Sequence, residues 1–248
     1  MLKDSLHTSV IIIVTFSMLG CHRDDETPLE TISINGITSY YVYSGIENDK
    51  KEGLPVIIFI GHPADSPKRL LEFANQFDQP VLLIWSGLLK SLPDDTLIDD
   101  QKVWQQKRKE FARQFESHSE HFSFNKKQVY LTGFSALAVY AWMLAYDRPE
   151  LYTGVVAMSA VSYPEQIQHT IENTASVITV VVRGEHDHMF PKHLEQEKQT
   201  GHTIESLNPH SRFILKKNKG HKDVAQYWLE QLQYIIQFIK PESISKDV

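Results

Sequence analysis

The sequence predicts an α/β fold in which a mostly parallel central sheet is covered by helices on both faces. Short, continuous apolar runs such as 55–60 are typical of strands that are buried on both sides. Longer segments with apolar residues at helical spacing, such as 101–115, alternate with these runs. The chain also lacks internal repeats and low-complexity segments. Alternating strand and helix along one chain favours a parallel sheet joined by crossover helices.

The chain begins with a segment typical of a secretory signal peptide, which we assign to residues 1–20. Lys3 precedes an apolar stretch over 10–20, and this stretch is shorter than the roughly 20 apolar residues of a membrane-spanning helix. Cys21 follows directly after a glycine and is the only cysteine, so no disulfide can form within the chain. The alternative is an ordinary signal peptide with a chance cysteine, or an uncleaved anchor.

The junction at Cys21 resembles the lipobox of bacterial lipoproteins, and this resemblance implies that Cys21 is lipidated and becomes the first residue of the mature chain. Acyl chains would hold the protein on a membrane surface, because each buried methylene contributes about 0.8 kcal/mol. The mostly polar residues 21–30 would form a short tether. We therefore expect a membrane-anchored lipoprotein of the bacterial cell envelope, on its periplasmic or extracellular face.

Residues 31–248 remain for the folded part, enough for one large α/β domain with a sizeable core. The net charge is -6 and charges of both signs are mixed along the chain. Nucleic acid is therefore not an expected partner, because a nucleic-acid-binding surface needs a basic stripe.

The elements follow in order from local patterning. Residues 31–34 and 39–43 flank Asn35-Gly36, a pair that tolerates the positive φ of a tight hairpin turn, so they predict an antiparallel edge to the sheet. Apolar runs rich in Val and Ile predict the remaining strands, and amphipathic or apolar stretches of ten residues or more predict the helices. The strands are expected at 55–60, 81–85, 129–134, 154–159, 177–182 and 212–216, and the helices at 68–76, 101–115, 136–146, 193–206 and 224–239.

A serine stands where one strand passes directly into a helix. The apolar strand 129–134 ends on Gly133-Phe134-Ser135 and is followed at once by a long apolar helix. This is the sequence form of a nucleophile elbow, a sharp turn that presents a serine hydroxyl above the sheet edge. Downstream, Asp187 follows another strand, and His221 stands beside Gly220. The order Ser, Asp, His belongs to one fold among several that use such a triad.

These motifs and the succession of elements resemble the α/β-hydrolase superfamily over nearly the whole mature chain, and most closely its small serine esterases. Asp187 lies in Gly184-Glu185-His186-Asp187 with Pro191 four residues on, similar to the acid turn of many members. The resemblance implies that Ser135 is the nucleophile, His221 the base and Asp187 the residue that orients it. It also implies an ester substrate of small molecular size. The connection between 159 and 177 is too short for the lid domain that many members carry.

The resemblance also implies two backbone donors for an oxyanion hole. One is the amide of Ala136 at the start of the helix, where unpaired N–H groups favour negative charge. The other comes from the loop after the first parallel strand, which here contains Gly61-His62-Pro63 in place of the usual His-Gly. Pro63 has no N–H, so the amide of His62 is the expected donor and that of Ala64 the alternative.

Two departures from the family pattern leave other functions open. Leu137 stands where the second glycine of Gly-x-Ser-x-Gly belongs, and the His62 loop is altered. A catalytically weak or inactive relative that acts as a surface binding protein is therefore one alternative. A peptidase or thioesterase is another, because the same triad cleaves amides and thioesters.

No cofactor or metal is expected, because acyl transfer by a triad needs neither. The chain has 12 histidines, and three of them, His186, His188 and His193, lie close to Asp187 in sequence. Their spacing matches no established zinc motif such as His-Glu-x-x-His, so no catalytic metal site is expected.

Overall fold

The computed structural model describes residues 29–34, 37–44, 53–61, 68–77, 79–86, 101–160, 175–189 and 194–239. Several sequence predictions lie outside these residues: the signal peptide, Cys21, the Asn35-Gly36 turn, the loop that contains His62, and most of the connection between 159 and 177, where no lid domain is expected.

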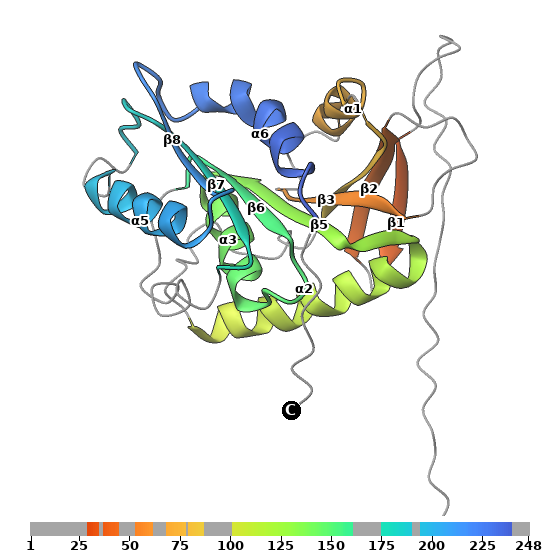
Figure 1. Cartoon of the computed structure of the whole chain (residues 1–248). Coiled ribbons are helices and arrows are strands. Elements are labelled where there is room, and N and C mark those ends of the chain that lie inside the picture. The colour runs from red at the N-terminus through yellow and green to blue at the C-terminus, as the bar shows by residue number, and fades with distance from the viewer. Residues whose placement is uncertain are drawn as a thin grey trace, which may run out of the picture.

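The strands form one mixed, mostly parallel sheet (Figure 1). Its strand order is β1-β2-β4-β3-β5-β6-β7-β8. The strands are β1 (Glu30–Ile34), β2 (Ile37–Ser44), β3 (Leu54–Ile60), β4 (Val81–Ser86), β5 (Phe124–Phe134), β6 (Gly154–Met158), β7 (Ile178–Gly184) and β8 (Arg212–Lys216). Strand β2 pairs antiparallel with both β1 and β4, and all other pairings are parallel. The predicted antiparallel hairpin edge is thereby confirmed.

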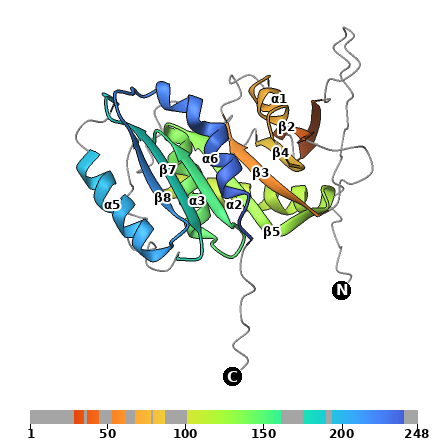
Figure 2. The same cartoon turned by 45° about the horizontal axis from the view of Figure 1, so that its top comes forward.

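Helices cover both faces of this sheet. They are α1 (Lys68–Ala74), α2 (Gln101–His121), α3 (Ala136–Asp147), α5 (Leu194–Leu207) and α6 (Trp228–Ile235), with a 3-10 turn, η4 (Asp223–Tyr227), before α6. Figure 1 shows α1 and α6 on one face and α2, α3 and α5 on the other. The turned view in Figure 2 shows α5 beside β8 at one end of the sheet and β2 at the other.

Two hydrophobic clusters, one under each helix layer, hold the layers to the sheet. Strand β5 contributes to both, because successive side chains of a strand lie on opposite faces. Val129 and Leu131 belong to the cluster that packs against α2 and α3, whereas Tyr130 belongs to the cluster that packs against α1 and α6. Helix α3 is apolar nearly all round and almost completely buried. None of the helices in the described ranges is long and apolar enough to cross a membrane.

The structure corrects the predicted final helix, which was expected as a single segment over 224–239. It begins instead with a 3-10 turn, and regular α-helix ends at Ile235. The last turn tightens through hydrogen bonds from Gln237 N–H to the Tyr234 carbonyl and from Phe238 N–H to the Ile235 carbonyl. The Phe238 carbonyl then accepts a hydrogen bond from the Tyr130 hydroxyl of β5. This contact joins the end of the segment to the central strand β5, 108 residues away in sequence.

Candidate active site

Ser135 occupies a strained turn between β5 and α3. Strand β5 ends at Phe134 and α3 begins at Ala136, so a single residue makes the turn. Ser135 adopts φ 59° and ψ -128°, a backbone conformation that costs about 1–3 kcal/mol and persists only where surrounding contacts enforce it. One such contact is the hydrogen bond from Ser135 N–H to the carbonyl of Met158 at the end of the neighbouring β6, at 2.8 Å.

Gly133 explains why the elbow needs a glycine before the serine. A Cβ atom at this position would lie 2.4 Å from the Leu137 carbonyl oxygen, so only glycine lets the first turn of α3 fold back onto β5. Leu137 itself, where the family pattern has glycine, is half-buried and packs against the cluster under α3. The structure therefore accommodates the leucine while keeping the turn closed.

Asp187 lies in the turn after β7 and is only 5% exposed. Its Oδ1 accepts a hydrogen bond from Met189 N–H at 3.2 Å, which leaves Oδ2 for another partner. This turn packs tightly on the loop after β8, because His186 N–H donates to the Lys219 carbonyl at 2.9 Å. Gly184 makes that approach possible, since a Cβ atom there would lie 2.3 Å from the Lys219 oxygen.

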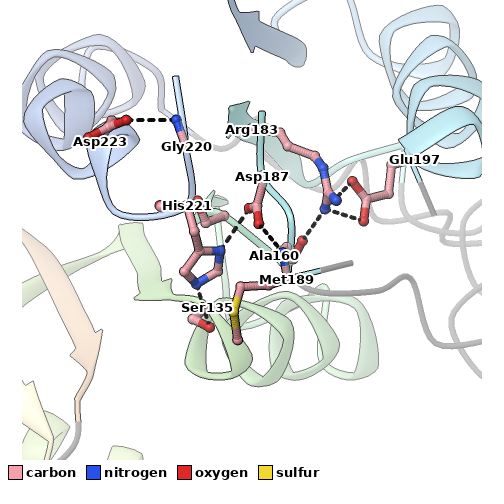
Figure 3. A network of polar contacts seen from close by, with 10 residues as sticks. Ser135, Ala160, Arg183, Asp187, Met189, Glu197, Gly220, His221 and Asp223 are labelled. Carbon is pink, nitrogen blue, oxygen red and sulfur yellow. Dashed lines mark hydrogen bonds and ion pairs between the residues drawn. The ribbon is translucent and has the colours of Figure 1, made fainter. Parts of the chain in front are cut away.

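His221 joins the other two residues (Figure 3). Its Nδ1 lies 2.7 Å from Oδ2 of Asp187, and its Nε2 lies 3.0 Å from Oγ of Ser135. Because an ionised carboxylate only accepts hydrogen bonds, Nδ1 carries the ring proton and Nε2 is left as an acceptor for the serine hydroxyl. The structure thus brings together the three residues that the sequence analysis singled out, in the relative geometry that proton transfer from Ser135 to His221 requires.

The imidazole also has an aromatic neighbour that the sequence analysis missed. Phe134, the middle residue of Gly-Phe-Ser, packs edge-on against the His221 ring with centroids 5.2 Å apart and an interplanar angle of 67°. Phe134 in turn lies against Trp228 of α6, at 6.2 Å. An aromatic side chain directly before the serine was the only sequence signal for this contact.

A buried ion pair between Arg183 and Glu197 lies close to Asp187, and the sequence analysis missed it as well (Figure 3). Nη1 of Arg183 on β7 lies 2.6 Å from both carboxylate oxygens of Glu197 on α5 and donates to the Ala160 carbonyl at 3.1 Å. Burial raises the pKa of Glu197, the charge of Arg183 opposes that rise, and the charge of Asp187 adds to it. The available sequence signal for this pair was a charged residue, Arg183, within an otherwise apolar strand and four residues before Asp187.

Of the predicted oxyanion donors, the structure describes Ala136. Ala136 is the first residue of α3, and the first amide of a helix has no carbonyl partner in that helix. It is exposed beside Ser135. The amides of His62 and Ala64 lie outside the described residues.

The histidines near Asp187 do not form a metal cluster in the part of the chain that the structure describes. The rings of His186 and His188 stack with centroids 6.3 Å apart. Within the described ranges, no group of three or more His, Cys, Asp or Glu side chains is placed to hold a metal ion. His193 lies outside these ranges.

No protein-family model matches the sequence, and comparison with curated proteins gives no match. Solved structures do resemble the fold. The predicted CIB-like hydrolase from Thermoplasma acidophilum is 15% identical with a TM-score of 0.57, and the match covers 86% of this chain and 99% of that one. A glucuronoyl esterase from Solibacter usitatus is 10% identical with a TM-score of 0.61, covering 95% and 87%. A dienelactone hydrolase-like promiscuous phosphotriesterase from metagenomic libraries is 11% identical with a TM-score of 0.60, covering 82% and 93%.

At these identities the likeness concerns the fold. Together with the strand order and the antiparallel β2, it shows that the chain has an α/β-hydrolase fold.

Proposed function

We propose that this protein is a serine hydrolase that cleaves carboxylic esters of small molecules through an acyl-enzyme on Ser135. The observation that carries the proposal is the continuous hydrogen-bonded chain from Asp187 Oδ2 through the His221 ring to Ser135 Oγ. A serine hydroxyl is a weak nucleophile at neutral pH and needs an adjacent base that a third group orients. The strained elbow at Ser135 and the burial of Asp187 add support.

Acylation begins when Oγ of Ser135 attacks the ester carbonyl carbon and its proton passes to Nε2 of His221. Asp187 keeps the ring in the required tautomer and stabilises the imidazolium that forms. The tetrahedral intermediate carries a negative oxygen, which the Ala136 amide would stabilise, a contribution of about 3 kcal/mol per donor. The carbon–oxygen bond to the alcohol then breaks, and His221 gives its proton to the departing alkoxide.

Deacylation repeats these steps with water. His221 removes a proton from a water molecule, whose oxygen attacks the acyl carbon, and the ester bond to Ser135 breaks. The proton returns to Oγ of Ser135 and the carboxylic acid leaves.

The test is covalent labelling with a fluorophosphonate probe, followed by hydrolysis of p-nitrophenyl esters of increasing chain length. The wild type is expected to react, and S135A is expected to lose labelling and to lower kcat by at least about a thousandfold. Ser206, an exposed serine on α5, offers a matched control, since S206A is expected to behave as the wild type. A folded wild type that neither reacts with the probe nor hydrolyses any ester would support a surface binding protein instead.

We also propose that Cys21 is lipidated and that the hydrolase acts at a membrane surface of the bacterial envelope. The support for this comes from the sequence alone, namely the apolar segment and the single cysteine that follows it.

A further inference from the structure

Ser159, the residue directly after β6, has an unusual backbone. It is completely buried and has φ 48°, a conformation that only a few per cent of non-glycine residues adopt. Among the described residues only three non-glycine residues have a positive φ, and the other two are Ser135 and Asn218. The strands that precede Ser135 and Ser159 are neighbours, because β5 pairs with β6. Two strained serines therefore follow adjacent parallel strands.

The main chain of this segment is held firmly in place. Ser159 N–H donates to the Val182 carbonyl of β7 at 2.8 Å, and the preceding carbonyl of Met158 accepts the hydrogen bond from Ser135 N–H at 2.8 Å. The backbone at Ser159 thus continues the sheet on one side and supports the nucleophile turn on the other. Strain at such a residue persists because these contacts enforce it.

The hydroxyl of Ser159 reaches the third member of the triad. Its Oγ donates to the main-chain carbonyl of His221 at 2.8 Å, across 62 residues of sequence. His221 lies in a loop after β8, and a loop residue has no ladder of hydrogen bonds to hold its position. Residues 158 and 159 together therefore contact the backbone of both Ser135 and His221.

We propose that Ser159 is a positioning residue, which holds the backbone of His221 so that the imidazole stays within hydrogen-bond distance of Ser135. This inference rests on the proposed function. A misplacement of about 1 Å in such an arrangement lowers a rate by roughly a hundredfold. A buried hydroxyl needs a hydrogen-bond partner, and many carbonyls in a protein could serve. Here the partner is the main-chain carbonyl of His221, the proposed base.

The test is a series of variants at this position, S159A, S159C and S159G, in the otherwise complete protein. S159A and S159G are expected to lower kcat by roughly tenfold to a hundredfold, to leave KM within about twofold, and to slow fluorophosphonate labelling in proportion. S159C, whose thiol is a weak donor of similar size, is expected to fall between the wild type and S159A. S159A removes the hydroxyl and keeps the strained backbone, whereas S159G removes the hydroxyl and relieves the strain. Comparing the two variants separates loss of the hydrogen bond from strain.

Ser44 supplies the matched control. It is completely buried on β2, and its Oγ donates to the Ala74 carbonyl at 2.5 Å, so S44A removes the same kind of bond far from the site. S44A is expected to lower the melting temperature as S159A does, with kcat unchanged.

The outcomes separate this inference from the proposed function. A wild type that is inert to the probe and to all esters overturns the proposed function. A reactive wild type whose S159A and S159G variants keep the wild-type kcat overturns the role of Ser159 alone. An equal fall in kcat for S44A and S159A also overturns it, because the effect would then follow from lost stability.

Discussion

At the scale of single residues, the elbow shows how one strained position depends on its neighbours. Ser135 has φ 59°, and the close contact of Gly133 with the Leu137 carbonyl closes the turn around it. The family pattern suggests a second glycine at 137, yet the leucine finds space at the edge of the core. What the turn requires is the approach of backbone to backbone at Gly133, and the side chain at 137 lies beside that contact.

His118 is a second residue whose local surroundings matter, because its burial affects the stability of the whole protein. It lies on α2, is 2% exposed and packs against Phe122 with ring centroids 6.2 Å apart. Burial, together with the nearby His121, lowers the pKa of His118 to about 4. The folded protein therefore keeps this imidazole neutral at pH values where the unfolded chain, with a histidine pKa of about 6.5, binds a proton.

This difference predicts an acid-sensitive contribution to stability. Above about pH 6.5 both states are neutral at His118 and its stabilising contribution is complete; as pH falls toward 4 only the unfolded state gains the proton. Over this pH window the free energy of unfolding is expected to fall by up to about 3 kcal/mol. Urea unfolding of wild type and H118L between pH 4 and 8 measures it, and the difference between the two curves should depend on pH. A substitution of the exposed His202 serves as the control. If the free energy of unfolding of H118L changed with pH in parallel with that of the wild type, the prediction would be contradicted.

At the scale of elements, a buried ion pair joins α5 to the sheet, in addition to apolar contacts and a hydrogen bond from Phe213 N–H of β8 to Oε1 of Glu205. Ile204 is the buried apolar side chain that it adds to the core, and Gly201 lets the helix approach Phe213 of β8, because a Cβ atom there would lie 2.4 Å from the Phe213 side chain. Arg183 on β7 and Glu197 on α5 are both almost completely buried. This pair therefore joins the helix to the strand that leads to Asp187.

Removing one partner of this pair is expected to be costly, and the two partners are not equivalent. E197L leaves a guanidinium buried that cannot lose its proton, so we expect a loss of about 3–5 kcal/mol in the free energy of unfolding. R183M leaves a carboxyl that can become neutral, because burial raises its pKa and the opposing charge of Arg183 is then gone, and is expected to cost less. The double variant R183M/E197L should recover much of the stability.

Chemical denaturation of the four proteins at neutral pH measures these differences. The exposed pair of Lys198 and Glu195 on the same helix is the control, and E195Q is expected to change stability by less than about 1 kcal/mol. A single R183M that is as costly as E197L would contradict the asymmetry.

At the scale of the whole molecule, the topology gathers distant residues at one edge of the sheet. Ser135 follows β5, Asp187 follows β7 and His221 follows β8, and these strands are parallel. The carboxyl ends of parallel strands meet at a common edge, where ligands bind in open α/β sheets. Residues separated by 86 and 34 positions in sequence thereby come within hydrogen-bond distance.

The proposed anchor concerns the whole molecule as well. In a bacterial host grown with labelled fatty acid, the wild type is expected to incorporate the label and fractionate with membranes, and C21S is expected to lose the label because the chain has no other cysteine. S135A provides the control and should keep the lipid. A wild type that carries no fatty acid, or a C21S variant that still does, would contradict lipidation.

The sequence alone was sufficient to predict most of the secondary structure and the three candidate residues, because the signals are local. Hydrophobic periodicity identifies strands and helices, and a Gly-x-Ser between a strand and a helix identifies the turn that presents Ser135. Asp187 and His221 were found from their place after strands, in a known order. The end of the last helix was predicted wrongly, because apolar periodicity does not distinguish regular α-helix from the tighter turns that Gln237 and Phe238 form after Ile235.

Only the tertiary structure decided how these residues meet. The hydrogen bonds of His221 to Asp187 and Ser135, the support from Ser159 and the buried pair of Arg183 with Glu197 all join segments far apart in sequence. Such contacts depend on which strands are neighbours, on their register and on the paths of the loops between them. Local patterning specifies which residues can form a strand, whereas the pairing of strands follows from packing the whole chain around one core.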